Sequence, residues 1–314
     1  MTDGKKHATR EAYGKTLAEL ADEGIDVVAV DADLAGATKL DAFRDAHPDR
    51  FVDVGIAEQD MMDVAAGLSL TGKVAFTGSF AVFATGRCYD QIRNTVCDSN
   101  LNVKVCPTHA GITVGEDGAT HQALEDVGMM RALPQMTVLV PADFNATRAA
   151  LRLAATTYGP FYVRMGRLPV SQVYDEGFSP EVGHAYVLRE GTDVTIAACG
   201  VEVGEALAAA DALADEGISA EVIDVFSIKP LDAGTLLVSA RKTGRVVSVE
   251  EHSVATGMGA AIATLLSENV PTPMRLTGMR TFGASAPATT LLEHFGLDAK
   301  GIVRETMECL AEWS

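Results

Sequence analysis

Glu58 is the residue whose position points most directly to chemistry. It follows Gly-Ile-Ala in the segment FVDVGIAEQDMM, at the edge of an apolar stretch where an unpaired carboxylate is costly to bury. The pattern predicts a strand over 51–54 and a helix over 59–70, with Glu58 in the turn between them. Because amides at a helix start stabilise an acid, helix-end stabilisation is the simplest explanation of Glu58 taken alone. A catalytic role requires other reactive side chains nearby.

Further reactive side chains follow the other predicted strands of the first half of the chain. They are Asp31 and Asp33, Phe80 and Phe83, His109, the loop acids Glu116 and Asp117 with His121, and Arg164 with Arg167. Ligands of parallel α/β sheets bind outside the carboxyl ends of the strands. Each of these residues alone is weak evidence, but histidines, acids and an arginine gathered at one such edge indicate a functional site.

The elements that position these residues are strands alternating with helices. Strands are predicted in IDVVAVDADL, KVAFTG, NVKVCPTH, MTVLVPAD and PFYVRMG, and helices in REAYGKTLAELADEG and FNATRAALRLAATTYG. Alternation of this kind predicts a mainly parallel sheet covered by helices on both faces. The alternation of strands and helices is interrupted by the connector LPVSQVYDEGFSPEVG and resumes after it. We therefore expect an α/β protein of two doubly wound domains: residues 1–172, a linker over 173–186, and a smaller domain over 187–314.

Composition narrows the class of protein. The 314 residues carry a net charge of -18, which disfavours binding to nucleic acid or to an anionic membrane. No run of about 18 apolar residues occurs, and the polar start MTDGKKHATRE lacks the core of a secretory signal, so we expect a cytoplasmic protein. The five cysteines form no C-x-x-C pair and are expected to be reduced core residues.

Four segments resemble one family, the transketolases. GIAEQ resembles the motif of the glutamate that activates thiamine diphosphate, and THAGITVGEDGATHQ resembles the substrate loop. EVIDVFSIKPLD and VVSVEEHSVATGMG are similar to stretches of the family's C-terminal domain. The resemblance covers essentially the whole chain and is to the carboxyl-terminal half of a transketolase, as in two-subunit (split) enzymes. It implies a pyrimidine-binding domain followed by a transketolase C-terminal domain.

The resemblance also implies roles for individual residues. Glu58 would hydrogen-bond the aminopyrimidine of thiamine diphosphate and favour the imino form that acts as its base. Phe83 resembles the aromatic residue stacked on that ring and Phe80 a lining residue of the same pocket. Asp33 resembles an acid near the thiazolium, although a cap at the strand end explains it equally well.

The substrate loop is expected to bind a ketose phosphate. The resemblance implies that His109, Asp117 and His121 contact the hydroxyls and carbonyl of the sugar, with the two histidines as acid–base groups. Arg164 would bind the phosphate through paired hydrogen bonds, and Arg167 is the alternative because one inserted residue would exchange them.

A complete metal site is not expected in this chain. Asp117-Gly118 with Asn145 downstream imitates the family's metal motif, but Glu116 stands where that motif has glycine. An N-terminal partner subunit would therefore supply the Mg²⁺ or Ca²⁺ ligands for the diphosphate. The expected assembly contains two copies of each subunit and transfers a two-carbon ketol unit from a ketose phosphate to an aldose phosphate, as in the pentose phosphate pathway.

Three alternatives remain open from the sequence. A deoxyxylulose-phosphate synthase shares GIAEQ and the AGI of the loop, and the beta subunit of a 2-oxoacid dehydrogenase shares the architecture. The third alternative is a regulatory subunit that kept the fold without the chemistry. The retained Glu58, His109, Asp117 and His121 favour a transketolase subunit. His252, in VEEHSVATG, is assigned to packing or to an interface rather than to the site.

Overall fold

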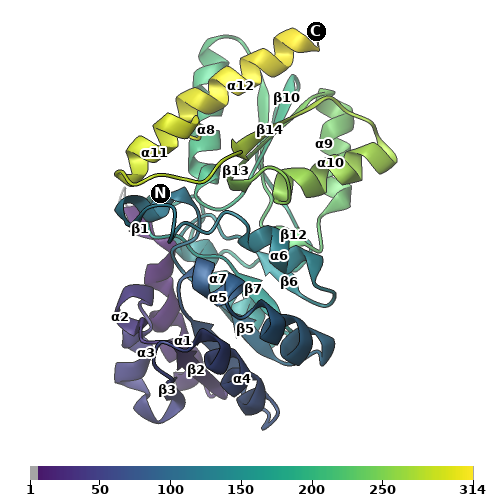
Figure 1. Cartoon of the computed structure of the whole chain (residues 1–314). Coiled ribbons are helices and arrows are strands. Elements are labelled where there is room, and N and C mark those ends of the chain that lie inside the picture. The colour runs from purple at the N-terminus through teal and green to yellow at the C-terminus, as the bar shows by residue number, and fades with distance from the viewer. Residues whose placement is uncertain (1–5, 314) are drawn as a thin grey trace.

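The computed structural model describes residues 6–313 and has two α/β domains, one above the other in Figure 1. The first contains a seven-stranded sheet of order β12-β6-β7-β5-β4-β2-β3, in which every pair but β12-β6 is parallel. Its strands are β2 (Val27–Asp31), β3 (Phe51–Asp53), β4 (Val74–Gly78), β5 (Val103–Val105), β6 (Thr137–Leu139), β7 (Phe161–Val163) and β12 (Ser227–Lys229). The two-domain α/β architecture predicted from the sequence is confirmed.

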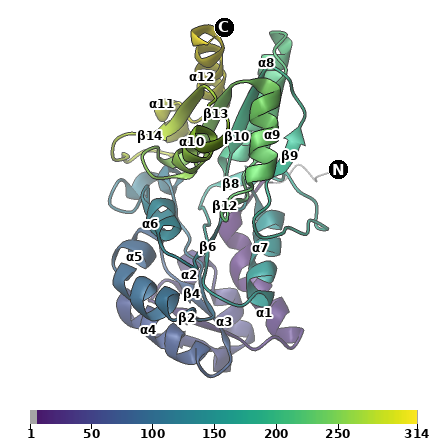
Figure 2. The same cartoon turned by 90° about the vertical axis from the view of Figure 1, so that its right-hand side faces the viewer.

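Helices cover both faces of the first sheet, as Figure 2 shows. One face packs against α1, α3 and α7, and the other against α4, the π-helix η3 and α6. The α-helices of this domain are α1 (Tyr13–Asp22), α2 (Ala35–Thr38), α3 (Asp41–Ala46), α4 (Glu58–Ser69), α5 (Ala81–Gly86), α6 (Asp126–Ala132) and α7 (Phe144–Thr156). The other helical segments are η1 (Thr9–Ala12), η2 (Pro48–Arg50), η3 (Gln91–Asp98) and η4 (Ile112–Asp117). Strands β2 and β4 are buried along their whole length because both faces are covered.

The second domain has a five-stranded sheet of order β14-β13-β10-β11-β9, parallel except for the edge strand β9. Its strands are β9 (Tyr186–Arg189), β10 (Val194–Ala198), β11 (Ala220–Asp224), β13 (Val246–Ser253) and β14 (Met274–Met279). Its helices are α8 (Glu202–Asp215), α9 (Ala233–Thr243), α10 (Met258–Asn269), α11 (Ala288–Phe295) and α12 (Ala299–Glu312). Within residues 6–313, no helix is both long and apolar enough to cross a membrane.

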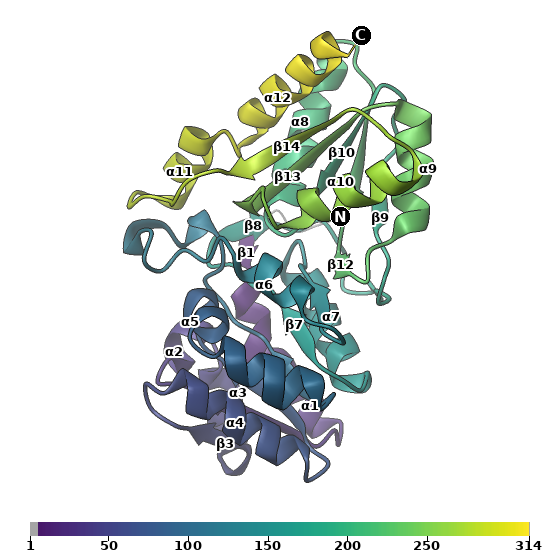
Figure 3. The ribbon, with the colours of Figure 1, turned by 45° about the vertical axis from the view of Figure 1, so that its right-hand side comes forward.

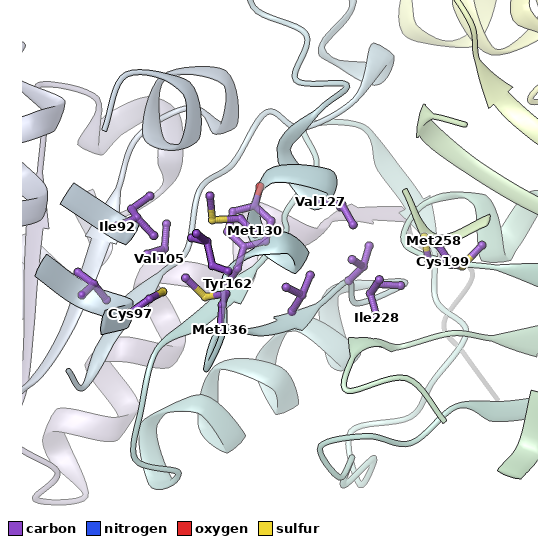
Figure 4. Close-up of a cluster of buried hydrophobic side chains, with 14 of the residues drawn as sticks. Ile92, Cys97, Val105, Val127, Met130, Met136, Tyr162, Cys199, Ile228 and Met258 are labelled. Atoms are coloured by element: carbon purple, nitrogen blue, oxygen red, sulfur yellow. The ribbon is translucent and has the colours of Figure 1, made fainter. Parts of the chain in front are cut away.

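Two features tie the domains together. Strand β12 lies beyond the predicted linker in the sequence, yet it pairs antiparallel with β6 and completes the sheet of the first domain. One apolar core also runs through both domains, from Cys97 of η3 through Val127 and Ile228 to Cys199 and Met258 (Figure 4). All five cysteines are buried and free, as predicted.

The sequence pattern missed several short elements. Strand β1 (Lys6–Ala8) pairs antiparallel with β8 (Pro169–Ser171), so the stretch expected to be a plain connector begins with a small two-stranded sheet. The helix expected over 59–70 is α4 and begins one residue earlier, at Glu58, because the N–H of Met61 already bonds the carbonyl of Ala57 at 2.9 Å. Glu58 is therefore the first residue of the helix rather than part of the preceding turn.

Candidate functional site

Glu58 is nearly buried and is paired with an arginine. Its side chain is 7% exposed, and its Oε1 accepts a hydrogen bond of 2.7 Å from Nη1 of Arg87. No side chain caps the start of α4. The Glu58 carboxylate therefore lies at the first turn of the helix, where the free backbone amides favour a negative charge. The ion pair offsets the cost of keeping this carboxylate out of water.

The Arg87 guanidinium makes a second contact, with an aromatic ring. Its central carbon lies 4.1 Å from the ring centre of Phe83, one turn earlier in the chain. Beside the ion pair, an open cavity of about 630 Å³ is lined by residues of α4 and by Arg87 and Gln91. The Arg87 guanidinium thus contacts both Glu58 and Phe83, the two groups that the family resemblance assigned to an aminopyrimidine.

Four aromatic side chains connect this end of the site to the substrate loop. The ring centres of Phe80 and His109 lie 3.8 Å apart with the rings stacked, and those of Phe80 and Phe83 lie 6.0 Å apart. The ring of His121 stands edge-on to Phe83 at 5.3 Å. Residues that follow β4 and β5 therefore meet at one edge of the sheet, as the strand order predicts.

His109 is buried and held by both ring nitrogens. Its Nε2 lies 3.0 Å from Nη1 of Arg10, and its Nδ1 lies 2.7 Å from Oγ1 of Thr108. Because arginine can only donate, Nε2 accepts and the ring proton sits on Nδ1. Burial, with Arg10 and Arg167 nearby, lowers the pKa of His109 to about 3. The imidazole is consequently neutral at physiological pH.

Arg10 is a site residue that the sequence analysis missed. Besides His109, it donates a 2.9 Å hydrogen bond to the carbonyl of Ala37. Burial and the charge of Arg167 lower the pKa of Arg10. Guanidinium groups are suited to bind an anion such as a phosphate. Arg10 lies in η1, ahead of the first long helix, where no motif distinguished it.

The structure places Arg164 and Arg167 in different environments. The Arg164 side chain is 5% exposed, and its Nε donates to the buried carboxylate of Asp126 at 2.7 Å. Its Nη2 donates to the carbonyls of Ala123 and Glu251 and to Asp126, and its Nη1 lies 3.6 Å from the Glu251 carboxylate. Arg164 balances the buried charge of Asp126, which would be costly if unpaired. The assignment of the phosphate to Arg164, with Arg167 as its alternative, stays a prediction.

Arg167 lies across the substrate loop. Its side chain is 35% exposed, and its Nη1 donates to the carbonyl of Val114 at 2.6 Å. The same nitrogen lies 3.5 Å from the Asp117 carboxylate. Asp117 and His121 are thus at the open side of the loop, where the sequence placed contacts to a sugar.

The two acids after β2 differ in their environment. Asp31 is fully buried, accepts the N–H of Leu34 at 2.7 Å and has its pKa raised by burial to about 6. Asp33 is exposed, with a φ of 59°, and its own N–H bonds Asp53 at 3.1 Å. The capping contact at this strand end therefore belongs to Asp31, which leaves the Asp33 side chain facing outward at the same edge as Glu58.

The residues present fit one part of thiamine diphosphate and not the other. A carboxylate beside an aromatic face suits the aminopyrimidine. Among residues 6–313, by contrast, no group of three or more His, Cys, Asp or Glu side chains is arranged to hold a metal ion. Asp117 faces Arg167, and Asn145 bonds the carbonyl of Tyr174, so the two do not form a metal site together.

Comparison with known proteins assigns both domains. Residues 5–171 match the family model described as transketolase, pyrimidine binding domain, and residues 183–302 match transketolase, C-terminal domain. The chain is 43% identical over 303 residues to the putative transketolase C-terminal section of Methanocaldococcus jannaschii, a match covering 95% of each chain. It is 44% identical over 305 residues to the 6-deoxy-6-sulfo-D-fructose transketolase subunit SqwH of Clostridium sp. (strain MSTE9), covering 97% of this chain and 95% of that protein.

A solved structure agrees with these matches. A protein described as split gene transketolase, inactive beta4 tetramer superposes with a TM-score of 0.90 at 48% identity. The alignment covers 98% of this chain and 99% of that one. The likeness thus extends over both domains and their relative placement.

Proposed function

This chain belongs to the transketolase family, and on that premise we propose that it is the C-terminal subunit of a two-subunit, thiamine-diphosphate-dependent transketolase. The observation that carries the proposal is an unbroken series of contacts. It runs from Glu58 through Arg87, Phe83, His121, Phe80 and His109 to Arg10. A carboxylate for a cofactor ring and guanidiniums for an anion thus lie at opposite ends of one site.

In the proposed reaction, bound thiamine diphosphate supplies the carbanion that accepts the two-carbon unit. Glu58 would hold a proton at the far nitrogen of the aminopyrimidine, with Phe83 stacked on the ring and Phe80 lining the pocket. His109 is kept neutral, and its imidazole would exchange a proton with a substrate oxygen once Nε2 leaves Arg10. Asp117 and His121 would orient the sugar hydroxyls, and Asp33 would face the thiazolium side.

The anion-binding end sets the substrate class. Arg10 and Arg167 would hold the terminal charged group of a ketose or aldose, in place of the Arg164 expected from the sequence. One similar protein carries 6-deoxy-6-sulfo-D-fructose in its name, so a sulfonate is an alternative to a phosphate within this family. Both groups are tetrahedral oxyanions that a pair of guanidiniums can bind. We propose a phosphorylated sugar as substrate and sulfofructose as the comparison compound.

The metal end requires a second protein. An N-terminal transketolase subunit would bring the ligands for Mg²⁺ or Ca²⁺ and the diphosphate, in an assembly with two copies of each subunit. The similar solved structure contains the beta subunit in an inactive tetramer. We accordingly expect this chain to self-associate and to remain inactive without its partner. A cytoplasmic location and a place in pentose phosphate metabolism belong to the same proposal.

The test is reconstitution. The chain is mixed with the N-terminal transketolase subunit of the same organism, Mg²⁺ and thiamine diphosphate, and ketol transfer is followed from xylulose 5-phosphate to ribose 5-phosphate. Activity in the mixture, and none in either subunit alone, supports the proposal. Pyruvate as donor separates it from the synthase and dehydrogenase alternatives. Cofactor binding without turnover of any ketose would indicate a regulatory subunit instead.

A further inference from the structure

The substrate loop contacts a buried acid of the second domain. Glu251, near the end of β13, is 3% exposed, and its Oε2 accepts hydrogen bonds from the N–H and the Oγ1 of Thr113 at 3.0 and 2.8 Å. Thr113 lies in η4, between His109 and Asp117. The approach is close: a Cβ at Gly111, whose φ is 76°, would lie 2.0 Å from the Glu251 carboxyl carbon. Only glycine allows the loop to pass this acid.

Glu251 also contacts the fixed end of β7. Its Oε1 lies 3.6 Å from Nη1 of Arg164, and its carbonyl accepts from Nη2 of Arg164 at 3.2 Å. Arg164 is itself fixed by Asp126. The Glu251 carboxylate therefore lies between the Arg164–Asp126 ion pair, which its Oε1 faces, and Thr113 of the loop, which its Oε2 contacts.

A second part of the C-terminal domain holds the same loop. Oγ of Ser285 donates to the carbonyl of Glu116 at 2.6 Å, and Nε2 of Gln122 donates to the carbonyl of Ala284 at 2.8 Å. Figure 3 shows α11 and the segment before it lying above the blue-teal loop that contains η4. The C-terminal domain thus contacts the loop at both ends of η4.

The neighbouring acid, Glu250, has a different task. It is 2% exposed and accepts the N–H groups of Met258 and Gly259 at 2.7 and 2.9 Å, at the start of α10. Among residues 6–313, its hydrogen bonds go to α10 and not to the substrate loop. Of these two adjacent buried glutamates of β13, Glu250 therefore supports the C-terminal domain internally, and Glu251 contacts the substrate loop.

We infer that Glu251 is a positioning residue that holds the substrate loop in the conformation that binds the sugar. The inference rests on the proposed function and gives the C-terminal domain a part in substrate binding. Glu251 acts through Thr113: it fixes η4, and η4 fixes the relative positions of His109 and Asp117. The carboxylate is suited to this because its Oε2 accepts two hydrogen bonds from Thr113 while its Oε1 forms an ion pair with Arg164 on the other side.

The test compares Glu251→Gln with Glu250→Gln in the reconstituted enzyme. A glutamine amide has one acceptor oxygen, so it cannot accept from Thr113 and face Arg164 with an acceptor at the same time. We expect Glu251→Gln to raise KM for the ketose phosphate about tenfold, with kcat and the Kd for thiamine diphosphate changed less than about twofold. Glu250→Gln is expected to lower Tm and leave KM unchanged. Equal KM in both variants and the parent would overturn the inference.

Thr113→Val tests the same contact from its other side, and it can be used if Glu251→Gln fails to fold. It removes only the hydroxyl donor from the pair, and we expect KM to rise about threefold to fivefold. The double variant should be no worse than Glu251→Gln alone, because both changes break the same contact. Additive effects would show that the two residues act separately.

Hydrogen exchange tests the contact without relying on activity. In the complex, amides 112–118 should exchange faster in Glu251→Gln and Thr113→Val, whereas Glu250→Gln should affect only the start of α10. Unchanged exchange in residues 112–118 contradicts the positioning role. Absence of ketol transfer in the parent mixture contradicts the proposed function instead, so the two failures are distinguishable.

Discussion

Around Glu58 the chain has an open cavity and a half-exposed counter-ion, Arg87, whereas around His109 the functional groups are hydrogen-bonded to residues of the chain itself. Arg87 pairs with Glu58 but has a half-exposed side chain. His109 is fixed by Thr108 and Arg10, and its loop is fixed by Arg167 and Glu251. On the proposed function, the end around Glu58 would be completed by another molecule, whereas the side chains around His109 already contact one another. Variants at the two ends should therefore fail in different ways.

Glu58→Gln tests the cofactor end and should have the largest effect. Loss of the carboxylate removes the group that holds a proton at the aminopyrimidine, so we expect kcat of the reconstituted enzyme to fall by about 100-fold or more with the fold intact. Steady-state ketol transfer measures kcat, and circular dichroism checks the fold. Asp41→Asn, at the first residue of α3, is the matched control and should keep full activity. Parent-like turnover by Glu58→Gln would remove the cofactor role from this end.

Arg10→Ala and Arg167→Ala test the substrate end. Each removes a charged donor for the terminal anion, so KM for the ketose phosphate should rise about 10- to 100-fold. KM for a ketose without a phosphate or sulfonate should stay close to the parent value. The measurement is a pair of KM values for each variant. A similar loss with both sugars would mean that the arginines only support His109.

The pH dependence of stability reports on the buried His109. Its pKa is about 3 in the folded chain against an ordinary value of 6.5, so the unfolded chain binds an extra proton between these values. Stability from this group is therefore lost as pH falls below 6.5, by up to about 1.4 kcal/mol per pH unit. Urea unfolding at pH 7 and pH 5 should show a smaller loss for His109→Gln than for the parent. Equal losses would show that the imidazole is more accessible than its contacts indicate.

Arg87→Ala should have the smallest effect of these variants, and it should strengthen cofactor binding where the others weaken function. The guanidinium occupies both Glu58 and Phe83, so binding of an aminopyrimidine has to displace it. Breaking a partly exposed ion pair costs up to about 1 kcal/mol, and its removal should tighten thiamine diphosphate binding by about threefold. Calorimetric titration of the mixed subunits measures the Kd. Arg93→Ala, an exposed arginine of η3, is the control. Weaker binding in Arg87→Ala would mean that the arginine stays and contacts the cofactor.

The sequence predicted the groups that lie at strand ends, because the strand order of a doubly wound sheet brings those ends together. Glu58, Phe80, Phe83 and His109 were found on this basis, and His121 and Asp117 through the loop motif. Their roles in catalysis and binding stay predictions. The strand order could not predict side-chain contacts between segments that are far apart in the sequence. Arg10 reaches His109 from 99 residues away, and Glu251 reaches Thr113 from 138 residues away.

Arg164 shows the limit most clearly. Its position after β7 correctly indicated the edge of the sheet, but the direction of a side chain depends on which partner is buried beside it. Asp126 is fully buried and attracts Arg164 inward. Periodicity carries no information about that partner. Arg87 was missed for a related reason, because its importance depends on Glu58 across a gap of 29 residues.

Strand β12 has a consequence for how this polypeptide is made. The edge strand β6 stays unpaired on that side until residues 227–229 have left the ribosome, although every other strand of the first sheet has been synthesised by residue 163. An open edge is a template for unwanted pairing. A fragment cut at the apparent domain boundary would expose it permanently. Expression of residues 1–172 alone should therefore yield aggregated material, and fragments for study should extend past residue 229.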